Sequence, residues 1–114
     1  MRKLSLKIND KDYELVMNRE SIKWLENNGF VLEEFTKKPL TYMDMLWYSL
    51  FIANHGEVSP SLAMKLQNSY QDEKGMKMYN KVISFAIDEY ESFFNALAGT
   101  NSKKTEEELE ITEV

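Results

Sequence analysis

Two short runs of alternating apolar and polar residues open the chain. The apolar positions are Leu4, Leu6 and Ile8 in the first run and Tyr13, Leu15 and Met17 in the second. A period of two is typical of a strand with one buried face, and the polar segment 9–12 between the runs favours a turn. We therefore expect a β-hairpin, which must pack on the following helices because an isolated hairpin is marginal in water.

Helical patterns begin after the hairpin. Asn18 is a favourable N-cap for a helix that ends near residues 27–29. The apolar positions of this helix are Ile22, Trp24 and Leu25. Apolar residues between positions 30 and 35 then favour a short helical turn. Pro39 separates this turn from the next helix, because a proline keeps the preceding residue out of helical angles.

The segment 42–53 is apolar at every position except Asp44 and Ser49. Thr41 is the expected N-cap, Asp44 lies in the first turn, and Gly56 is the expected C-cap. At about 100° per residue, both faces of this helix are apolar. Such a helix is either the central element of the fold or partly a surface for another molecule. We favour the central position, because the hairpin and the flanking amphipathic helices are sufficient to surround it.

Two further helices complete the pattern. Ser59 and Pro60 are typical of a helix start. The longest helix is expected from about residue 72 to residue 98, closed by Gly99. Gly75 weakens its start, so the helix either frays there or begins a few residues later. The apolar stripes are Leu62, Leu66 and Tyr70 on the shorter helix and Tyr79, Val82, Ile83, Ala86, Tyr90, Phe93, Phe94 and Leu97 on the longer one.

These elements predict a mainly α fold, a small helical domain of about four to five helices with an N-terminal β-hairpin, over residues 1–99. Residues 100–114 form an acidic tail, in which the apolar residues are Leu109, Ile111 and Val114. The tail holds two lysines against five glutamates, a balance of −3 within the total formal charge of −5. A segment so polar and so charged is expected to be disordered in isolation.

Composition narrows the classes of function. Removing the tail's −3 from the total of −5 leaves the body with only −2, and its basic residues are scattered apart from Lys37 and Lys38. Binding of nucleic acid through phosphate neutralisation is therefore disfavoured. The chain has no cysteine and no apolar run after Met1 that would indicate a signal peptide. Its apolar helix of about twelve residues is too short to span a bilayer, so we expect a soluble intracellular protein that binds no membrane.

Residue patterns for catalysis are weak. His55 is the only histidine, and without cysteine it lacks the partners of a usual zinc site, so we interpret it as a residue at a helix C-terminus. Adjacent carboxylates such as Asp88 and Glu89 diverge by about 100° on a helix and do not form a catalytic dyad. The glycines are isolated and form no phosphate-binding loop. We expect no catalytic, cofactor-binding or metal-binding residues and no enzymatic activity.

Methionines and aromatic residues are frequent in the helical region. Most of them are expected to fill the core, but flexible thioethers also suit surfaces that accommodate variable apolar partners. A subset would line a groove for an amphipathic or extended peptide, where the long helix and the region 64–78 exceed the core. The candidate partner-binding residues are Met45, Tyr48, Met64, Met76, Met78 and Phe85.

The order of these elements resembles a known protein family. A hairpin of the form Leu-x-Leu-x-Ile-Asn-Asp-Lys-Asp-Tyr-Glu-Leu precedes a helix opened by Asn18. An apolar helix, a helix start at Ser59 and Pro60, a long final helix and an acidic tail follow. Over about residues 4–98, this layout resembles the tail assembly chaperones of long-tailed bacteriophages and the related proteins of prophages in Gram-positive bacteria.

The resemblance implies a non-catalytic, helical protein that binds the tape measure protein and keeps it soluble until tail tube subunits polymerise around it. Members of the family self-associate along their client, and a programmed frameshift commonly adds a second domain that engages the tail tube protein. Lys103 and Lys104 are compatible with a slippery codon run. The implied location is the cytoplasm of the infected bacterial host, not the mature virion. The alternatives are another small phage structural or completion protein of the head–tail connector type, and an acidic regulator that binds a host protein.

Overall fold

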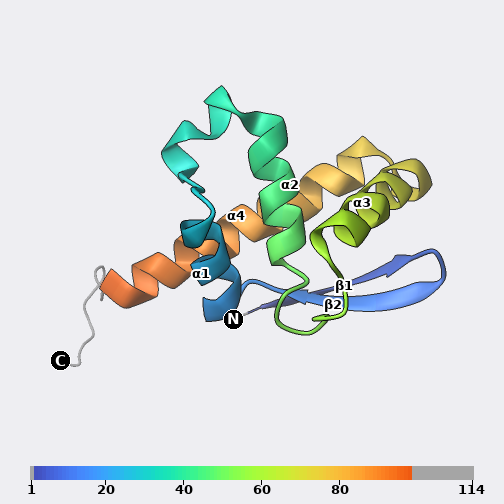
Figure 1. Cartoon of the computed structure of the whole chain (residues 1–114), viewed down its shortest axis with the longest axis horizontal. Helices are drawn as coiled ribbons and strands as arrows, with labels where there is room; N and C mark the ends of the chain where they lie inside the picture. Colours follow the sequence, from blue (N-terminus) through green and yellow to red (C-terminus); the bar gives the residue numbers. More distant parts are fainter. Residues whose placement is uncertain (1, 99–114) are drawn as a thin grey trace.

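The computed structural model describes residues 2–98. Their elements follow in the order β1 Lys3–Ile8, β2 Lys11–Val16, α1 Arg19–Asn27, the 3-10 helix η1 Leu32–Lys37, α2 Pro39–Ser49, α3 Pro60–Lys74 and α4 Met76–Ala98 (Figure 1). The predicted fold class is confirmed, since helices dominate and the strands form an antiparallel hairpin at the N-terminus. The predicted disordered tail 100–114 and the predicted cap at Gly99 lie outside the described residues.

The hairpin closes through two turn residues. Ile8 pairs with Lys11, and Asn9 and Asp10 between them have φ angles of 51° and 65°. Two successive positive φ angles match a type I′ turn, whose twist agrees with that of the paired strands. The predicted turn at residues 9–12 is therefore too long, because β2 already begins at Lys11.

The outer edge of β2 is covered by the segment that follows α2. The backbone N–H of Glu14 donates to Nε2 of His55 at 3.0 Å, and Nδ2 of Asn54 donates to the carbonyl oxygen of Glu14 at 3.2 Å. Nε2 of His55 therefore acts as an acceptor for the backbone N–H at this strand edge. Because α2 ends at Ser49, the predicted place of His55 at a helix C-terminus is wrong.

Helix α1 starts as predicted. The side chain of Asn18 accepts a hydrogen bond from the N–H of Ser21 at 3.0 Å, and Oγ of Ser21 accepts one from the N–H of Asn18 at 3.3 Å. This reciprocal capping box satisfies backbone donors that the first helical turn leaves free. Ile22 and Leu25 of the same helix are buried in the core.

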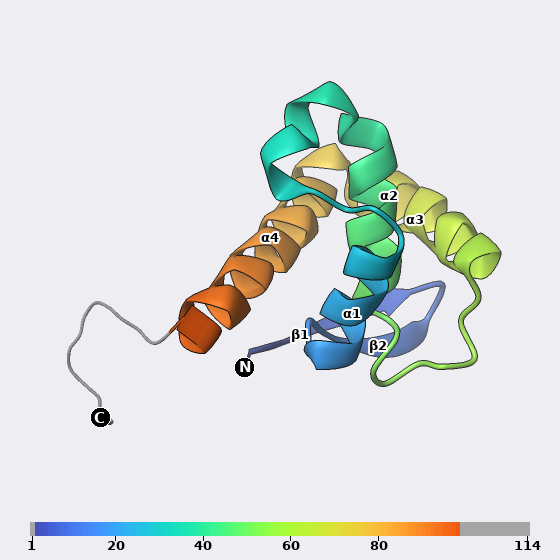
Figure 2. The same ribbon diagram turned by 60° about the vertical axis from the view of Figure 1, so that its left-hand side comes forward.

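Helix α2 lies at the centre of the fold, as predicted, where it contacts α1, α3 and α4 (Figures 1 and 2). The helix begins at Pro39 with Lys38 as N-cap, so the predicted cap at Thr41 is wrong. A proline at the first helical position already has a helical φ and needs no partner for an N–H group. The apolar residues of α2 and the following turn with no exposed surface are Leu46, Trp47, Leu50 and Phe51.

Gly75 divides the C-terminal region into α3 and α4. Ser59 caps α3 as predicted, since its Oγ accepts a hydrogen bond from the N–H of Leu62 at 3.1 Å. At the other end of α3, Gly75 has a φ of 89° and a ψ of 164°, a conformation that is essentially restricted to glycine. Helix α4 begins at Met76, a few residues after position 72, in agreement with the predicted weakening of its start by Gly75.

Candidate protein-binding site

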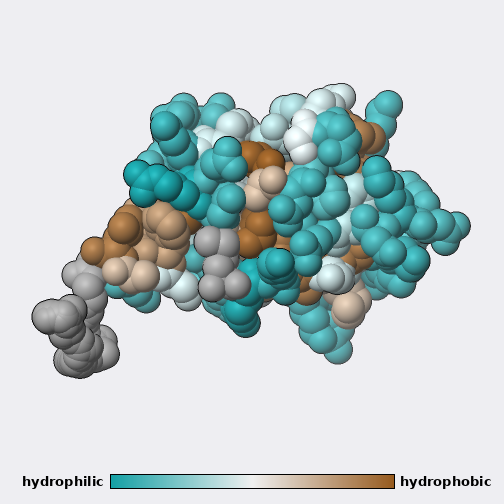
Figure 3. All heavy atoms as spheres, turned by 90° about the horizontal axis from the view of Figure 1, so that it is seen from below, coloured by the Kyte–Doolittle hydropathy of each residue, from teal (hydrophilic) through white to brown (hydrophobic). Residues whose placement is uncertain are grey.

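The C-terminal half of α4 extends beyond the elements that cover its N-terminal half (Figure 2). The buried residues of the N-terminal half are Tyr79, Val82, Ile83 and Ala86. Exposure rises from Tyr90 onward, and Leu97 is 63% exposed. Apolar side chains accordingly gather over the end of α4, at the left of the face drawn in Figure 3.

Four side chains form an apolar surface on this half of the helix, which we name the α4 ridge: Tyr90, Phe93, Phe94 and Leu97. The ring centroids of Tyr90 and Phe94 lie 4.9 Å apart, and those of Phe93 and Phe94 lie 5.9 Å apart. Tyr90 also packs edge-on against the buried Phe30 at 5.2 Å. Aromatic pairs at these distances are favourable, so the ridge is an ordered extension of the core at its Tyr90 end.

Two grooves flank the ridge, and Phe94 lines both. The α1 groove, of about 220 Å³, lies between α1 and α4, and the η1 groove, of about 480 Å³, lies between η1 and α4. The charged residues of the α1 groove are Arg19, Lys23 and Glu26, and those of the η1 groove are Glu33 and Glu91. The two grooves therefore share an apolar wall but differ in charge.

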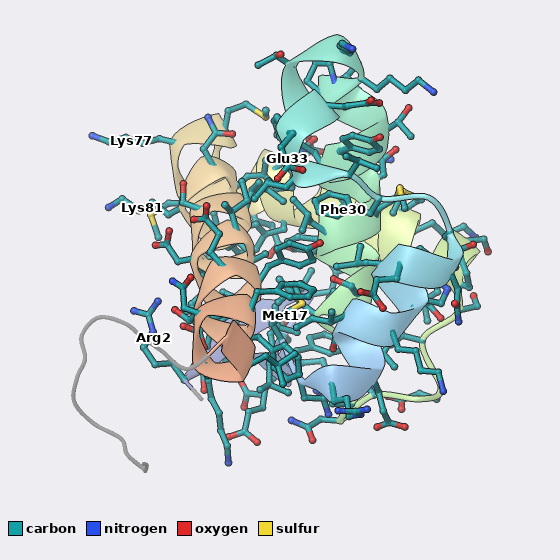
Figure 4. The ribbon with its side chains drawn as sticks, turned by 90° about the vertical axis from the view of Figure 1, so that its left-hand side faces the viewer. Arg2, Met17, Phe30, Glu33, Lys77 and Lys81 are labelled. Carbon is teal, nitrogen blue, oxygen red and sulfur yellow. The ribbon has the colours of Figure 1, made fainter. Side chains whose placement is uncertain are left out.

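An ion pair fixes the base of the ridge to the start of the chain. Glu89 is only 6% exposed and accepts hydrogen bonds from the backbone N–H of Arg2 at 3.0 Å and from its Nε at 2.7 Å. Burial raises the pKa of Glu89, but the hydrogen bonds and the charge of Arg2 outweigh burial and lower the pKa overall. Arg2 approaches from the side of α4 away from Met17 (Figure 4) and also lies over the ring of Phe85 at 5.4 Å.

A second apolar hollow lies at the opposite end of α4. Leu40, Met43, Met64 and Met76 surround a space of about 390 Å³ between α2, α3 and the start of α4, which we name the methionine groove. Leu40 is 77% exposed and Met76 is 53% exposed. Large apolar side chains at such exposure are typical of surfaces that contact other molecules.

The floor of the methionine groove is polar and internally paired. Nε2 of Gln67 donates to Oδ1 of Asp44 at 2.8 Å, and the hydroxyl of Tyr79 donates to Oε1 of Gln67 at 2.6 Å. Burial raises the pKa of the Tyr79 hydroxyl well above its usual range, and the charge of Asp44 adds to that shift. The hydroxyl therefore stays protonated and acts as a fixed donor to Gln67.

The structure brings two of the six predicted partner-binding residues together, Met64 and Met76 in the methionine groove. The other four lie apart from that pair: Met78 is exposed on α4, while Met45, Tyr48 and Phe85 are half-buried against the core. Tyr48, for example, packs edge-on against Trp24 with ring centroids 4.8 Å apart. Partner binding by these six residues stays a prediction.

Sequence reasoning missed Phe93, Phe94 and Leu97 as surface residues, because they continue a stripe whose earlier members are buried. The predicted length of the last helix could have indicated that these residues are exposed. With 23 residues, α4 spans about 35 Å, whereas the nine residues of α1 span only about 14 Å. A helix so much longer than its neighbour must carry part of its apolar stripe beyond it.

Within residues 2–98, no helix is long and apolar enough to cross a membrane, and no group of three or more His, Asp or Glu side chains could hold a metal ion. Neither a curated protein nor a solved structure matches the chain. A family model described as "Domain of unknown function (DUF5055)" matches residues 1–110, which include the acidic segment up to Glu110. The chain therefore belongs to the DUF5055 family.

Proposed function

We propose that this chain is a tail assembly chaperone of a long-tailed bacteriophage or prophage. It binds the tape measure protein in the cytoplasm of the bacterial host, keeps that protein soluble while the tail tube assembles, and is absent from the mature virion. It catalyses no reaction. Self-association along the client, and engagement of the tail tube protein through a longer frameshifted form, belong to the same proposal.

The α4 ridge is the observation that carries this proposal. In helix-in-groove recognition, an amphipathic helix places its apolar face against an apolar wall of its partner. The α1 and η1 grooves offer such a wall on both sides of Phe94. A client helix in either groove covers Phe94, and one in the α1 groove also covers Leu97, which is 63% exposed among the described residues.

The expected strength of one such site suits a chaperone that must release its client. Full burial of a large apolar side chain contributes about 1.5–3 kcal/mol, so Phe94 and Leu97 together contribute at most about 3–6 kcal/mol before the costs of association. A single copy therefore binds weakly. Copies that also contact one another along the client are linked, so they bind tightly through multivalency, and tube subunits can displace them one at a time.

Assignment of the client rests on the layout of elements. The hairpin, the capped helix α1, the central apolar helix α2 and the long final helix follow in the order on which the resemblance to the phage chaperones rests. Those proteins coat a long helical client of apolar character. The exposed ridge at the end of α4 is a surface of matching chemistry.

Co-expression with the tape measure protein encoded beside it tests the function. We expect a larger soluble fraction of the tape measure protein and a complex that survives purification. If both proteins express well and neither effect appears, the proposed function is refuted. Recovery of the chain from purified virions would instead favour a head–tail connector.

Paired variants test the site. We expect Phe94→Ser with Leu97→Ser to abolish co-purification, because both side chains belong to the α4 ridge. The control is Leu40→Ser with Met76→Ser, which makes the same change at two exposed apolar residues of the methionine groove. Circular dichroism should show that both double variants remain folded. Equal loss of binding in the two double variants would contradict the assignment of the ridge.

A further inference from the structure

The α1 groove is the cationic one of the two grooves beside the α4 ridge. Arg19 and Lys23 line it, and within the described part of the chain neither forms a salt bridge. Glu26 is the carboxylate among its lining residues, whereas the η1 groove carries Glu33 and Glu91. An acidic segment with apolar side chains is therefore attracted to the α1 groove and repelled from the η1 groove.

The chain itself supplies such a segment shortly after α4. Residues 105–111 contain four glutamates, no lysine or arginine, and the apolar residues Leu109 and Ile111. Glutamates stand directly on both sides of Leu109. The match to the family model extends through this segment to Glu110, so the segment belongs to the family domain.

Chain length selects the α1 groove over the methionine groove. Leu97 lines the α1 groove, and residues 99–108 can span at most about 33–36 Å, so Leu109 returns to that groove with length to spare. Met76, in the methionine groove, lies about 33 Å away along the axis of α4. Leu109 would reach it only through an almost fully extended connection.

We propose that residues 105–111 dock in the α1 groove of the same chain. Leu109 and Ile111 lie against the apolar wall formed by the α4 ridge, and the neighbouring glutamates face Arg19 and Lys23. The docked segment covers surface that a partner of the ridge needs, so it acts as an internal competitor. Docking itself is independent of any partner, whereas the competition rests on the proposed function.

Tethering makes weak docking sufficient. A segment connected through about ten residues is held at an effective concentration on the order of millimolar. Docking is half-occupied when the dissociation constant of the free segment equals that concentration. If the segment is docked nine-tenths of the time, the apparent affinity for a partner of the groove falls about tenfold.

A spin label after the segment tests docking without any partner. The chain has no cysteine, so Thr112→Cys provides one attachment point in an isotope-labelled full chain. We expect the label to broaden the amide resonances of α1, while those around Met76 at the far end of α4 stay sharp. A uniform response along both helices, or none in α1, overturns the proposal.

Charge variants identify the groove. Arg19→Glu with Lys23→Glu should remove the broadening in α1, and Glu107→Lys with Glu108→Lys should restore it in that background. The matched control, Glu33→Gln with Glu91→Gln in the η1 groove, should leave the broadening unchanged. Loss of broadening in the control, with the chain still folded by circular dichroism, contradicts docking in the α1 groove.

Two further samples separate the remaining possibilities. A mixture of spin-labelled chain without isotope and isotope-labelled chain without the spin label should show no broadening, because docking is within one chain. Broadening in that mixture assigns the contact to two copies and overturns the proposal.

A chain ending at Lys104 should then bind the tape measure protein about three- to tenfold more tightly. Failure of that last effect, with docking seen by the spin label, removes the competition but not the docking.

Discussion

Replacement of Arg2 by alanine removes the cation that joins the start of the chain to the base of the α4 ridge. Its Nε donates to the Glu89 carboxylate at 2.7 Å, and the Glu89 side chain is only 7% exposed. The variant keeps the backbone N–H that donates to Glu89 at 3.0 Å. It therefore leaves a buried carboxylate with one hydrogen bond fewer and without the charge of Arg2.

The magnitude follows from that geometry. A hydrogen bond between charged groups contributes about 1.5–3 kcal/mol. Because Arg2 is 65% exposed, water replaces part of the lost interaction, and we expect the lower end, about 1–2 kcal/mol. For a domain of roughly 100 residues, each kcal/mol shifts the melting temperature by about 4–8 °C. A fall of about 4–16 °C near neutral pH is therefore expected from these values.

The effect must depend on pH with a definite sign. The pKa of Glu89 is lowered in the folded protein, so its ionised form stabilises the fold above the unfolded pKa of about 4.3. That contribution disappears as the pH falls through the lower pKa of the folded state. The difference between Arg2→Ala and the wild type should therefore be full at about pH 6 and shrink towards about pH 3.

Thermal unfolding followed by circular dichroism at several pH values measures this difference. The matched control is Lys3→Ala, which breaks the neighbouring pair between Lys3 and Glu14 at 3.8 Å. Those side chains are 62% and 50% exposed, so we expect less than about 1 kcal/mol. An Arg2→Ala effect as small as that of the control, or one that persists unchanged in acid, would refute the reasoning.

Three further substitutions probe the fold. Tyr79→Phe leaves Oε1 of Gln67 without its buried donor, so the free energy of unfolding measured in urea should fall by about 1–3 kcal/mol. An unchanged free energy of unfolding would show that water reaches this site. Asp10→Gly relieves a φ of 65° in the type I′ turn and should stabilise the protein by a few tenths of a kcal/mol to about 1 kcal/mol in the same assay. Gly75→Ala meets no atom within 4 Å, so its expected cost of about 1–3 kcal/mol is purely conformational, and an unchanged midpoint would contradict it.

Local chemistry made much of the fold predictable. The period of two in the hairpin, the cap at Asn18 and the start at Ser59 each depend on residues within one or two turns of chain, and each is present in the structure. Burial of α2 was predictable as well, because a helix that is apolar on both faces must be surrounded. Here Trp47 is enclosed completely and its Nε1 donates to the carbonyl oxygen of Ala63 at 2.8 Å.

Errors arose where two local signals compete. Pro39 was interpreted as a separator because it restricts Lys38, yet the same proline is also a favourable first residue of a helix, and α2 starts there. Gly75 is predicted only to weaken the start of the last helix or to shift that start by a few residues. Its positive φ instead ends α3, because the main chain turns at a conformation that other residues avoid.

Contacts between distant parts of the chain left no sequence signal. Arg2 and Glu89 are separated by 87 positions, and nothing in either local pattern indicates that they pair. The same holds for the hydrogen bonds that join Asp44, Gln67 and Tyr79 below the methionine groove. These interactions form only when distant elements pack together. The hydrophobic periodicity of each element therefore cannot predict them.

The α4 ridge is exposed because the neighbouring elements do not cover the whole length of α4. Its amino-acid composition is the same kind as that of the buried half of the helix. The stripe residues of α4 are apolar throughout, but Ala86 is completely buried and Leu97 is 63% exposed. What differs is how closely the neighbouring elements pack, because α2 and α3 contact α4 directly, while α1 and η1 flank its second half across grooves. A surface made in this way is held in place by the buried half of its own helix. It therefore offers a partner an ordered wall, and binding does not require that wall to fold first.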